Sequence, residues 1–359
     1  MQSGMKVMRA QFRWPCGALI SLVVLSSSGC SELAVRLGFR VRLDHKPVTA
    51  VATSLKDERD GSAVGALGPG QSARLVIVAT TADGQQYATV GAGRGKVAFD
   101  NYTITATVVQ LTGRGRVSLS ADPRVSEGKV AHLRIAPVAH ADVVTELDIP
   151  VRYDIPFAAD YSGADGWPGA DGLDGLDGNS GADAAPGSVD PTTGLIGPQG
   201  PGGRGSDGTN GSDGSNGSNG SPGLPLHIWV RLHDADAGKP LLQVKVAGAG
   251  RQSLYLVDPN GGSLRVLDNG GAGGRGGRGG RGGRGGSGGL GSPSGLSGLD
   301  GQPGRDGWPG RAGAGGTITV SVDPAAQAYV GCITWSNHSG DGAPGPAAAI
   351  TVEPVAALW

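Results

Sequence analysis

Glycine returns at every third position over two long blocks of this chain, residues 163–225 and 270–316. Seven unbroken triplets run over 163–181 and eight over 202–223; eight more run over 270–291 and, after a phase slip at 292–295, seven over 295–313. Strict period three with scattered proline predicts extended polyproline II rods, whose three residues per turn place every third side chain on one edge. The sequence therefore predicts four rods, each about 65 to 75 Å long.

The glycine blocks resemble collagen, because Gly-X-Y is its rule and triplets such as Gly166-Trp167-Pro168 and Gly307-Trp308-Pro309 fit it. They also resemble polyglycine II bundles, in which short rods of one chain pack side by side with their glycine edges inward. Proline is sparse, and each run ends after seven or eight triplets, so paired runs favour out-and-back hairpins. A bundle implies a monomer and collagen a homotrimeric stalk; both alternatives stay open.

The third rod is almost bare of side chains. From 273 to 289 it is mostly Gly-Gly-X, so two of its three edges carry no side chain and we expect it inside the bundle. We expect Gly279 and Gly280 to face neighbours, so that Val at either position loosens the bundle, whereas Arg281 on the third edge tolerates replacement. In the collagen frame only Gly279 is obligatory, and Gly280 is free to vary.

Charge is divided between the two blocks, although the net charge of the 359-residue chain is only -1. The first block holds eight aspartates against one arginine, and the second holds six arginines against two aspartates. On a polyproline II rod both charged series repeat about every 9 Å along one edge. We therefore expect rows of opposite charge to pair and set register between rods. The candidate pairing residues are Asp165, Asp171, Asp174, Asp177 and Asp183 in the first block, and Arg275, Arg278, Arg281 and Arg284 in the second.

The four Gly-Gly-Arg triplets also support a different function. They resemble the arginine-glycine segments of RNA-binding proteins, which bind strands through charge and stacking. No aromatic residue is interleaved here, and an export signal excludes cytoplasmic nucleic acid, so the implied partner is an extracellular polysaccharide or another polyanion. The aspartates stand too far apart along their rod to ligate one calcium ion together, and we predict neither a metal site nor a cofactor.

The N-terminal residues 1–30 have the pattern of an export signal. Basic residues without any acid precede an apolar run at 17–25, and a small-residue stretch then ends at Cys30. This end resembles the lipobox of bacterial lipoproteins, although Ser27 stands where a leucine is usual. The resemblance implies lipid attachment at Cys30 and a membrane-anchored, exported protein of the Gram-negative cell envelope, at the outer membrane. Ordinary secretory cleavage is the alternative. The remaining Cys332 is expected to be a small buried hydrophobe.

Two β modules flank the glycine blocks. Alternating strands separated by turns are expected in 31–160, and again in 226–359, where the block 270–316 interrupts the module. Gly68-Pro69-Gly70, followed by a strand and Ala82-Asp83-Gly84, resembles the opening of bacterial immunoglobulin-like domains. The fold class expected is mainly β, with two antiparallel β-sandwich-like modules and a bundle of polyproline II or polyglycine II rods formed by 161–225 and 270–316.

Catalytic patterns are weak. The six histidines are scattered without the spacing of a zinc pair, and Ser336 and Ser339 beside His338 lack the strand-turn-helix context of a nucleophile. The sequence therefore predicts no enzyme. It favours a structural spacer or adhesive surface lipoprotein, with a secreted polyanion binder and a collagen-like trimeric stalk as alternatives.

Overall fold

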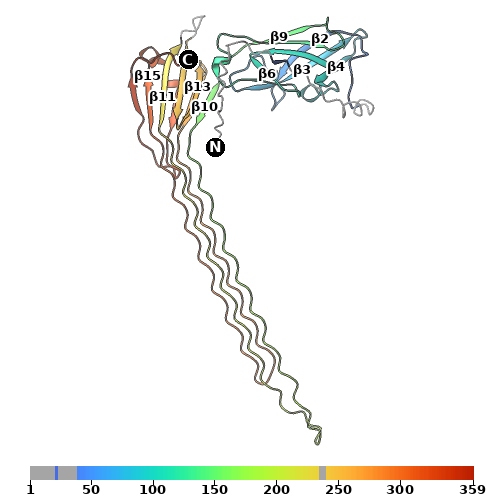
Figure 1. Ribbon diagram of the computed structural model, residues 1–359, viewed down its shortest axis with the longest axis vertical. Coiled ribbons are helices and arrows are strands. Elements are labelled where there is room, and N and C mark those ends of the chain that lie inside the picture. Colours follow the sequence, from blue (N-terminus) through green and yellow to red (C-terminus); the bar gives the residue numbers. More distant parts are fainter. Residues whose placement is uncertain (1–20, 23–38, 234–239) are drawn as a thin grey trace, which may run out of the picture. The chain divides into compact units, whose positions relative to one another are not determined.

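The computed structural model describes residues 21–22, 39–233 and 240–359 (Figure 1). The chain is mainly β and divides into two compact units, Met1–Tyr153 and Asp154–Trp359. Cys30 and nearly all of the expected export signal lie outside the described residues. Among the residues described, no helix has the length and apolar character needed to cross a membrane.

Unit 1 contains two antiparallel sheets that share one core. One sheet has the order β1-β5-β8-β9 and the other β2-β3-β7-β6, with β4 beside β3. Their strands are β1 (Ser21–Leu22), β2 (Val48–Lys56), β3 (Ser72–Thr81), β4 (Gln86–Ala88), β5 (Tyr102–Thr107), β6 (Val109–Leu111), β7 (Arg116–Leu119), β8 (Ala131–Pro137) and β9 (Thr145–Ile149). Short 3-10 turns are η1 (Gly91–Gly93), η2 (Phe99–Asn101) and η3 (Pro123–Val125).

The core of unit 1 follows from side-chain alternation. In β8, Leu133 and Ile135 point inward and are fully buried, while Arg134 between them is exposed. In the other sheet Leu75 and Ile77 belong to the same cluster of buried side chains. Burial of the apolar faces of both sheets against each other holds the unit together.

Unit 2 contains a three-stranded sheet, β10-β14-β16, and a five-stranded sheet, β13-β12-β11-β15-β17. Buried side chains from both sheets form one cluster. The elements are β10 (Pro156–Asp160), β11 (Leu226–His233), β12 (Leu241–Gly248), β13 (Arg251–Val257), β14 (Ser263–Leu267), β15 (Ile318–Val322), η4 (Pro324–Cys332), β16 (Ile333–Ser336) and β17 (Ala349–Val352). β10 pairs with β14, so the second module begins before residue 160.

The expectation of a purely antiparallel second module is wrong. Only β11-β12 and β12-β13 are antiparallel, whereas β10-β14, β14-β16, β11-β15 and β15-β17 are parallel. The reason is the path of the chain. Each of three connections (161–225, 268–317 and 337–348) leaves a strand of the three-stranded sheet and returns into the five-stranded sheet, so equivalent strands run in the same direction.

The first two of these connections are long, and they run out from the sheets and back (Figure 1). We define segment 1 (163–181), segment 2 (202–223), segment 3 (270–289) and segment 4 (295–313), and together call them the glycine array. The connection 182–201 between segments 1 and 2 lies at the distal end, where Val189 and Ile196 form a short antiparallel bridge. Figure 1 shows the four segments side by side over their whole length.

Backbone hydrogen bonds join the segments at every third residue. In segment 1, Gly166 donates to the Ala272 carbonyl at 2.7 Å, and each later glycine repeats this bond along segment 3. Gly280 of segment 3 donates to the Ser212 carbonyl at 2.9 Å, and its own carbonyl accepts from Gly304 at 2.8 Å. Extended backbone cannot satisfy its own polar groups, so these bonds between segments do so instead.

The pattern of bonds defines the positions of the segments. Segments 2 and 3 each bond to all three others, while no backbone bond joins the described residues of segments 1 and 4. Segment 3 therefore lies inside, as the Gly-Gly-X pattern predicted, but it shares that position with segment 2. Segments 1 and 3 run in one direction, and segments 2 and 4 in the other.

Candidate functional site

Close contact in the glycine array leaves no room for a side chain on two edges of segment 3. A Cβ atom added to Gly279 would lie 2.0 Å from the Gly304 carbonyl oxygen of segment 4. One added to Gly280 would lie 1.9 Å from the Leu173 carbonyl oxygen of segment 1. The prediction that both glycines face neighbours is confirmed, and Arg281 on the third edge is exposed.

The aspartates of segment 1, together with Asp183 just beyond its end, connect it to segment 3 through backbone groups. The Oδ1 atom of Asp174 accepts a hydrogen bond from the Arg281 backbone N–H at 2.7 Å. Asp171 and Asp177 accept in the same way from Arg278 and Arg284, also at 2.7 Å. Asp165 and Asp183 accept from Ala272 and Leu290 at the same spacing of 107 residues. A charged acceptor strengthens each of these bonds.

The predicted pairing of opposite charges differs from what the structure contains. The carboxylates reach the arginine residues but bind their backbone N–H groups, because the carboxyl group stands beside the neighbouring backbone. Within residues 39–233 and 240–359, no ion pair or side-chain hydrogen bond involves the guanidinium groups of Arg275, Arg278, Arg281 or Arg284. These four side chains are exposed and lie along one edge of segment 3.

Segment 2 uses two side-chain series that the sequence analysis missed. Ser212 Oγ accepts from the Leu173 N–H at 2.7 Å, and Ser206, Thr209, Ser215 and Ser218 do the same along segment 1. Asn216 Oδ1 accepts from the Trp308 N–H of segment 4 at 2.8 Å, a role repeated by Asp207, Asn210, Asp213 and Asn219. Both series are visible in the sequence, because Ser or Thr and then Asp or Asn recur every three positions between the glycines of segment 2.

Large apolar side chains are exposed towards the distal end of the array. Leu176 is 74% exposed, and it lies opposite Thr209, far along segment 1 from the sheets. The distal connection adds Leu195 and Ile196, which are 70% and 73% exposed. Leu290, Leu296 and Leu299 are also exposed. They lie at or near the distal ends of segments 3 and 4, which residues 290–294 connect. Exposed apolar groups that gather at one place are typical of a contact surface.

The base of the array contains a buried carboxyl group. Asp268 follows β14 and is fully buried between the ends of segment 2 and segment 4. Its Oδ1 atom accepts from the Leu224 N–H at 2.8 Å, but its Oδ2 atom has no hydrogen-bond partner among the described residues. Loss of hydration on burial raises the pKa of Asp268 to about 6, against which the bond from Leu224 acts.

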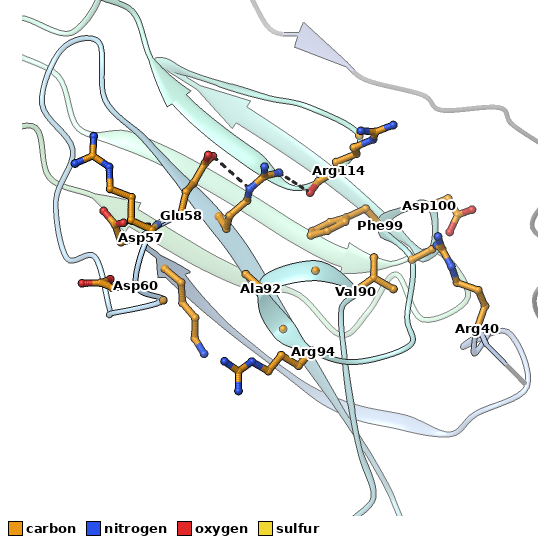
Figure 2. A pocket seen from close by; sticks show the side chains of 18 residues that line it. Arg40, Asp57, Glu58, Asp60, Val90, Ala92, Arg94, Phe99, Asp100 and Arg114 are labelled. Carbon is orange, nitrogen blue, oxygen red and sulfur yellow. Dashed lines mark hydrogen bonds and ion pairs between the residues drawn. The ribbon is translucent and has the colours of Figure 1, made fainter.

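A second candidate site is a hollow of about 980 Å³ in unit 1, drawn in Figure 2. It is lined by the turn after β2, the start of β3, the η1 loop, η2 and the turn before β7. Figure 2 shows Arg40, Arg94 and Arg114 spread around it, with the ring of Phe99 between them. Phe99 is only 6% exposed, so it serves the core more than the hollow.

Among the described side chains that line the hollow, more cationic groups than acidic groups have no ion pair. Glu58 pairs with Arg74 at 3.3 Å and with Arg116 at 2.9 Å. Asp57 and Asp60 each use Oδ1 to accept a backbone N–H two residues on, at 2.7 and 2.8 Å, and the N–H of Ser62 lowers the pKa of Asp60. In the described parts of the chain, the cationic groups of five lining side chains have no hydrogen bond or ion pair: Arg40, Lys56, Arg59, Arg94 and Arg114.

The remaining candidates for chemistry are structural contacts. Ser336 Oγ lies 2.9 Å from His338 Nδ1 and donates to Asn269 Oδ1 at 2.9 Å, which fastens the base of segment 3. Ser321 Oγ lies 2.8 Å from His227 Nε2 and donates to Glu353, yet Ser321 is only 2% exposed, so a substrate has no access to this hydroxyl. No group of three metal-ligating side chains occurs within the residues described. Cys332 is half-buried beside the core of unit 2.

No protein-family model matches this chain, and no curated protein is significantly similar to it.

Proposed function

We propose that this protein is a non-enzymatic, lipid-anchored spacer of the cell envelope, whose glycine array is a polyglycine II bundle that holds an adhesive apolar end away from the sheets. The observation that carries the proposal is the gathering of exposed leucine and isoleucine side chains at the distal end of the array. Hydrogen bonds at every third residue of four segments make the array stiff, and stiffness is what a spacer requires.

The oligomeric alternative is a collagen-like trimer. Two features of the array support a bundle formed by one chain. Segments that follow one another along the chain run in opposite directions, and two glycine edges of segment 3 are in close contact instead of one. Two further points stay predictions of the sequence: the resemblance of unit 1 to immunoglobulin-like domains, and the export of the protein to the outer membrane.

Adhesion to an apolar surface tests the proposal. Beads that carry the protein by its N-terminal end are pressed against an alkyl-coated surface, and the detachment force is measured. The variant Leu195→Ser/Ile196→Ser/Leu296→Ser should lose most of the adhesion, because its exposed apolar area at the distal end is reduced. The matched control, Trp167→Ser/Trp308→Ser, removes exposed apolar groups nearer the sheets and should retain it. Equal loss in both variants would contradict a distal adhesive end.

A second function, binding of a polyanion along segment 3, is favoured by one observation. The guanidinium groups of Arg275, Arg278, Arg281 and Arg284 are exposed, and they have no partner within the part of the chain that the structure describes; they repeat about every 9 Å. Retention on heparin that falls with salt and is lost when all four become Gln would support it. Unchanged retention of that variant would exclude it.

A further inference from the structure

The hollow in unit 1 has the size and the polar groups of a ligand site. Its volume of about 980 Å³ is at the upper end of the range for pockets that hold small molecules, so it accommodates several sugar units. The lining comes from segments far apart in the chain, which a β fold brings together around the ends of β2, β3 and β7.

The charges of the hollow select an anion. The guanidinium groups of Arg40, Arg59, Arg94 and Arg114 and the ammonium group of Lys56 are free among the described residues. Glu58 is neutralised by two arginines, and the other acidic lining residues, Asp57, Asp60 and Asp100, are fewer than these five cations. A guanidinium group binds a carboxylate or sulfate through two parallel hydrogen bonds. Because these groups surround the hollow on several sides, a ligand with anionic groups at intervals uses more of them than a single small anion does.

The acidic residues distinguish between classes of polyanion. Asp57 and Asp60 each have one carboxylate oxygen occupied by a backbone N–H, which leaves the other oxygen to accept a hydrogen bond. Sugar hydroxyl groups supply such donors. The one aromatic lining residue, Phe99, is buried and offers no exposed face on which a base would stack.

We propose that the hollow of unit 1 binds a segment of an acidic polysaccharide, with Arg40, Arg59 and Arg94 contacting its anionic groups and Asp57 and Asp60 its hydroxyl groups. The site lies in a different unit of the chain from the glycine array and does not depend on the spacer function.

Binding of the full chain to polygalacturonate tests the site, with neutral dextran and a single-stranded DNA oligonucleotide as comparison ligands. All proteins carry Gln at 275, 278, 281 and 284, so that the arginine row of the array contributes nothing. Arg40→Gln/Arg59→Gln/Arg94→Gln should weaken polygalacturonate binding about tenfold or more, because charge-assisted contacts are lost. The control Arg42→Gln/Lys129→Gln/Arg134→Gln removes the same charge from unit 1 outside the hollow and should change binding less than about threefold.

The single variant Arg59→Gln, which alters an exposed side chain, should give a smaller loss in the same direction. Equal weakening by the hollow variant and the control would overturn the site. Binding of DNA as tight as that of polygalacturonate, or binding of polygalacturonate no tighter than that of dextran, would overturn the ligand class.

Discussion

Substitution of Gly280 by alanine tests the close contact between segments 1 and 3. The added methyl group would lie 1.9 Å from the Leu173 carbonyl oxygen, and relief to 3.4 Å requires the two segments to separate by about 1.5 Å. At that separation the bonds from Gly172 to the Arg278 carbonyl and from Gly175 to the Arg281 carbonyl, both 2.7 Å, are broken. The bond from the Arg281 N–H to Asp174 is broken with them.

Three lost hydrogen bonds at about 1 kcal/mol each predict that Gly280→Ala lowers the free energy of local opening by about 3 kcal/mol. Amide hydrogen exchange at Gly172 and Gly175 measures this quantity directly. The control Arg281→Ala alters the exposed edge of the same triplet and should leave exchange unchanged. Gly279→Ala, whose methyl group would lie 2.0 Å from the Gly304 carbonyl oxygen, should show a similar loss towards segment 4. Unaltered exchange in Gly280→Ala, or an equal effect of Arg281→Ala, would refute the close contact.

Three further predictions concern single side chains. The raised pKa of Asp268, about 6, means that the fold favours its protonated form. The contribution of Asp268 to stability is therefore greatest below about pH 4 and falls by about 3 kcal/mol between about pH 4 and 6. Asp268→Asn should remove this part of the pH dependence in denaturant unfolding between pH 4 and 7, and parallel curves for both proteins would contradict it. Asp174→Asn should preserve protection of the Arg281 amide in hydrogen exchange, because an Asn side chain can accept this kind of bond, as Asn216 does from the Trp308 N–H. Asp174→Ala should lower the free energy of local opening at the Arg281 amide by about 1 kcal/mol. Equal protection in both variants is the opposing result. Cys30→Ala should move the protein from membranes to the soluble fraction, and membrane association of the wild type without metabolic lipid labelling would oppose this.

Period-three glycine predicted extended segments with every third residue on one edge, but it left a collagen-like trimer and a bundle of one chain open as alternatives. The Gly-Gly-X pattern also predicted that segment 3 is enclosed, because a bare edge permits close backbone contact, but it did not indicate that segment 2 shares this position. In the β units, alternation correctly indicated that 31–160 and 226–359 contain short strands. The parallel pairing of β10, β14 and β16 was not predicted, because it depends on where each connection returns and no local pattern encodes that.

The partner of each charged side chain was not predicted from the sequence either. Equal spacing indicated that the aspartates of segment 1 and the arginines of segment 3 lie side by side, but spacing does not distinguish a guanidinium group from the backbone N–H of the same residue. The hollow was missed for another reason. Arg40, Arg59 and Arg94 are far apart in the sequence, and only the three-dimensional arrangement of unit 1 brings them to one place.

Constant spacings of 107 residues between segments 1 and 3, and of 92 between segments 2 and 4, limit how the length of the array can change in evolution. Removal of one residue from a segment shifts each later glycine off its edge, and removal of one triplet from one segment alone leaves donors opposite the wrong acceptors. Length is therefore gained or lost in whole steps of about 9 Å, with one triplet added to or removed from all four segments together. Natural variants of different reach should differ by multiples of twelve residues, distributed equally over the four segments.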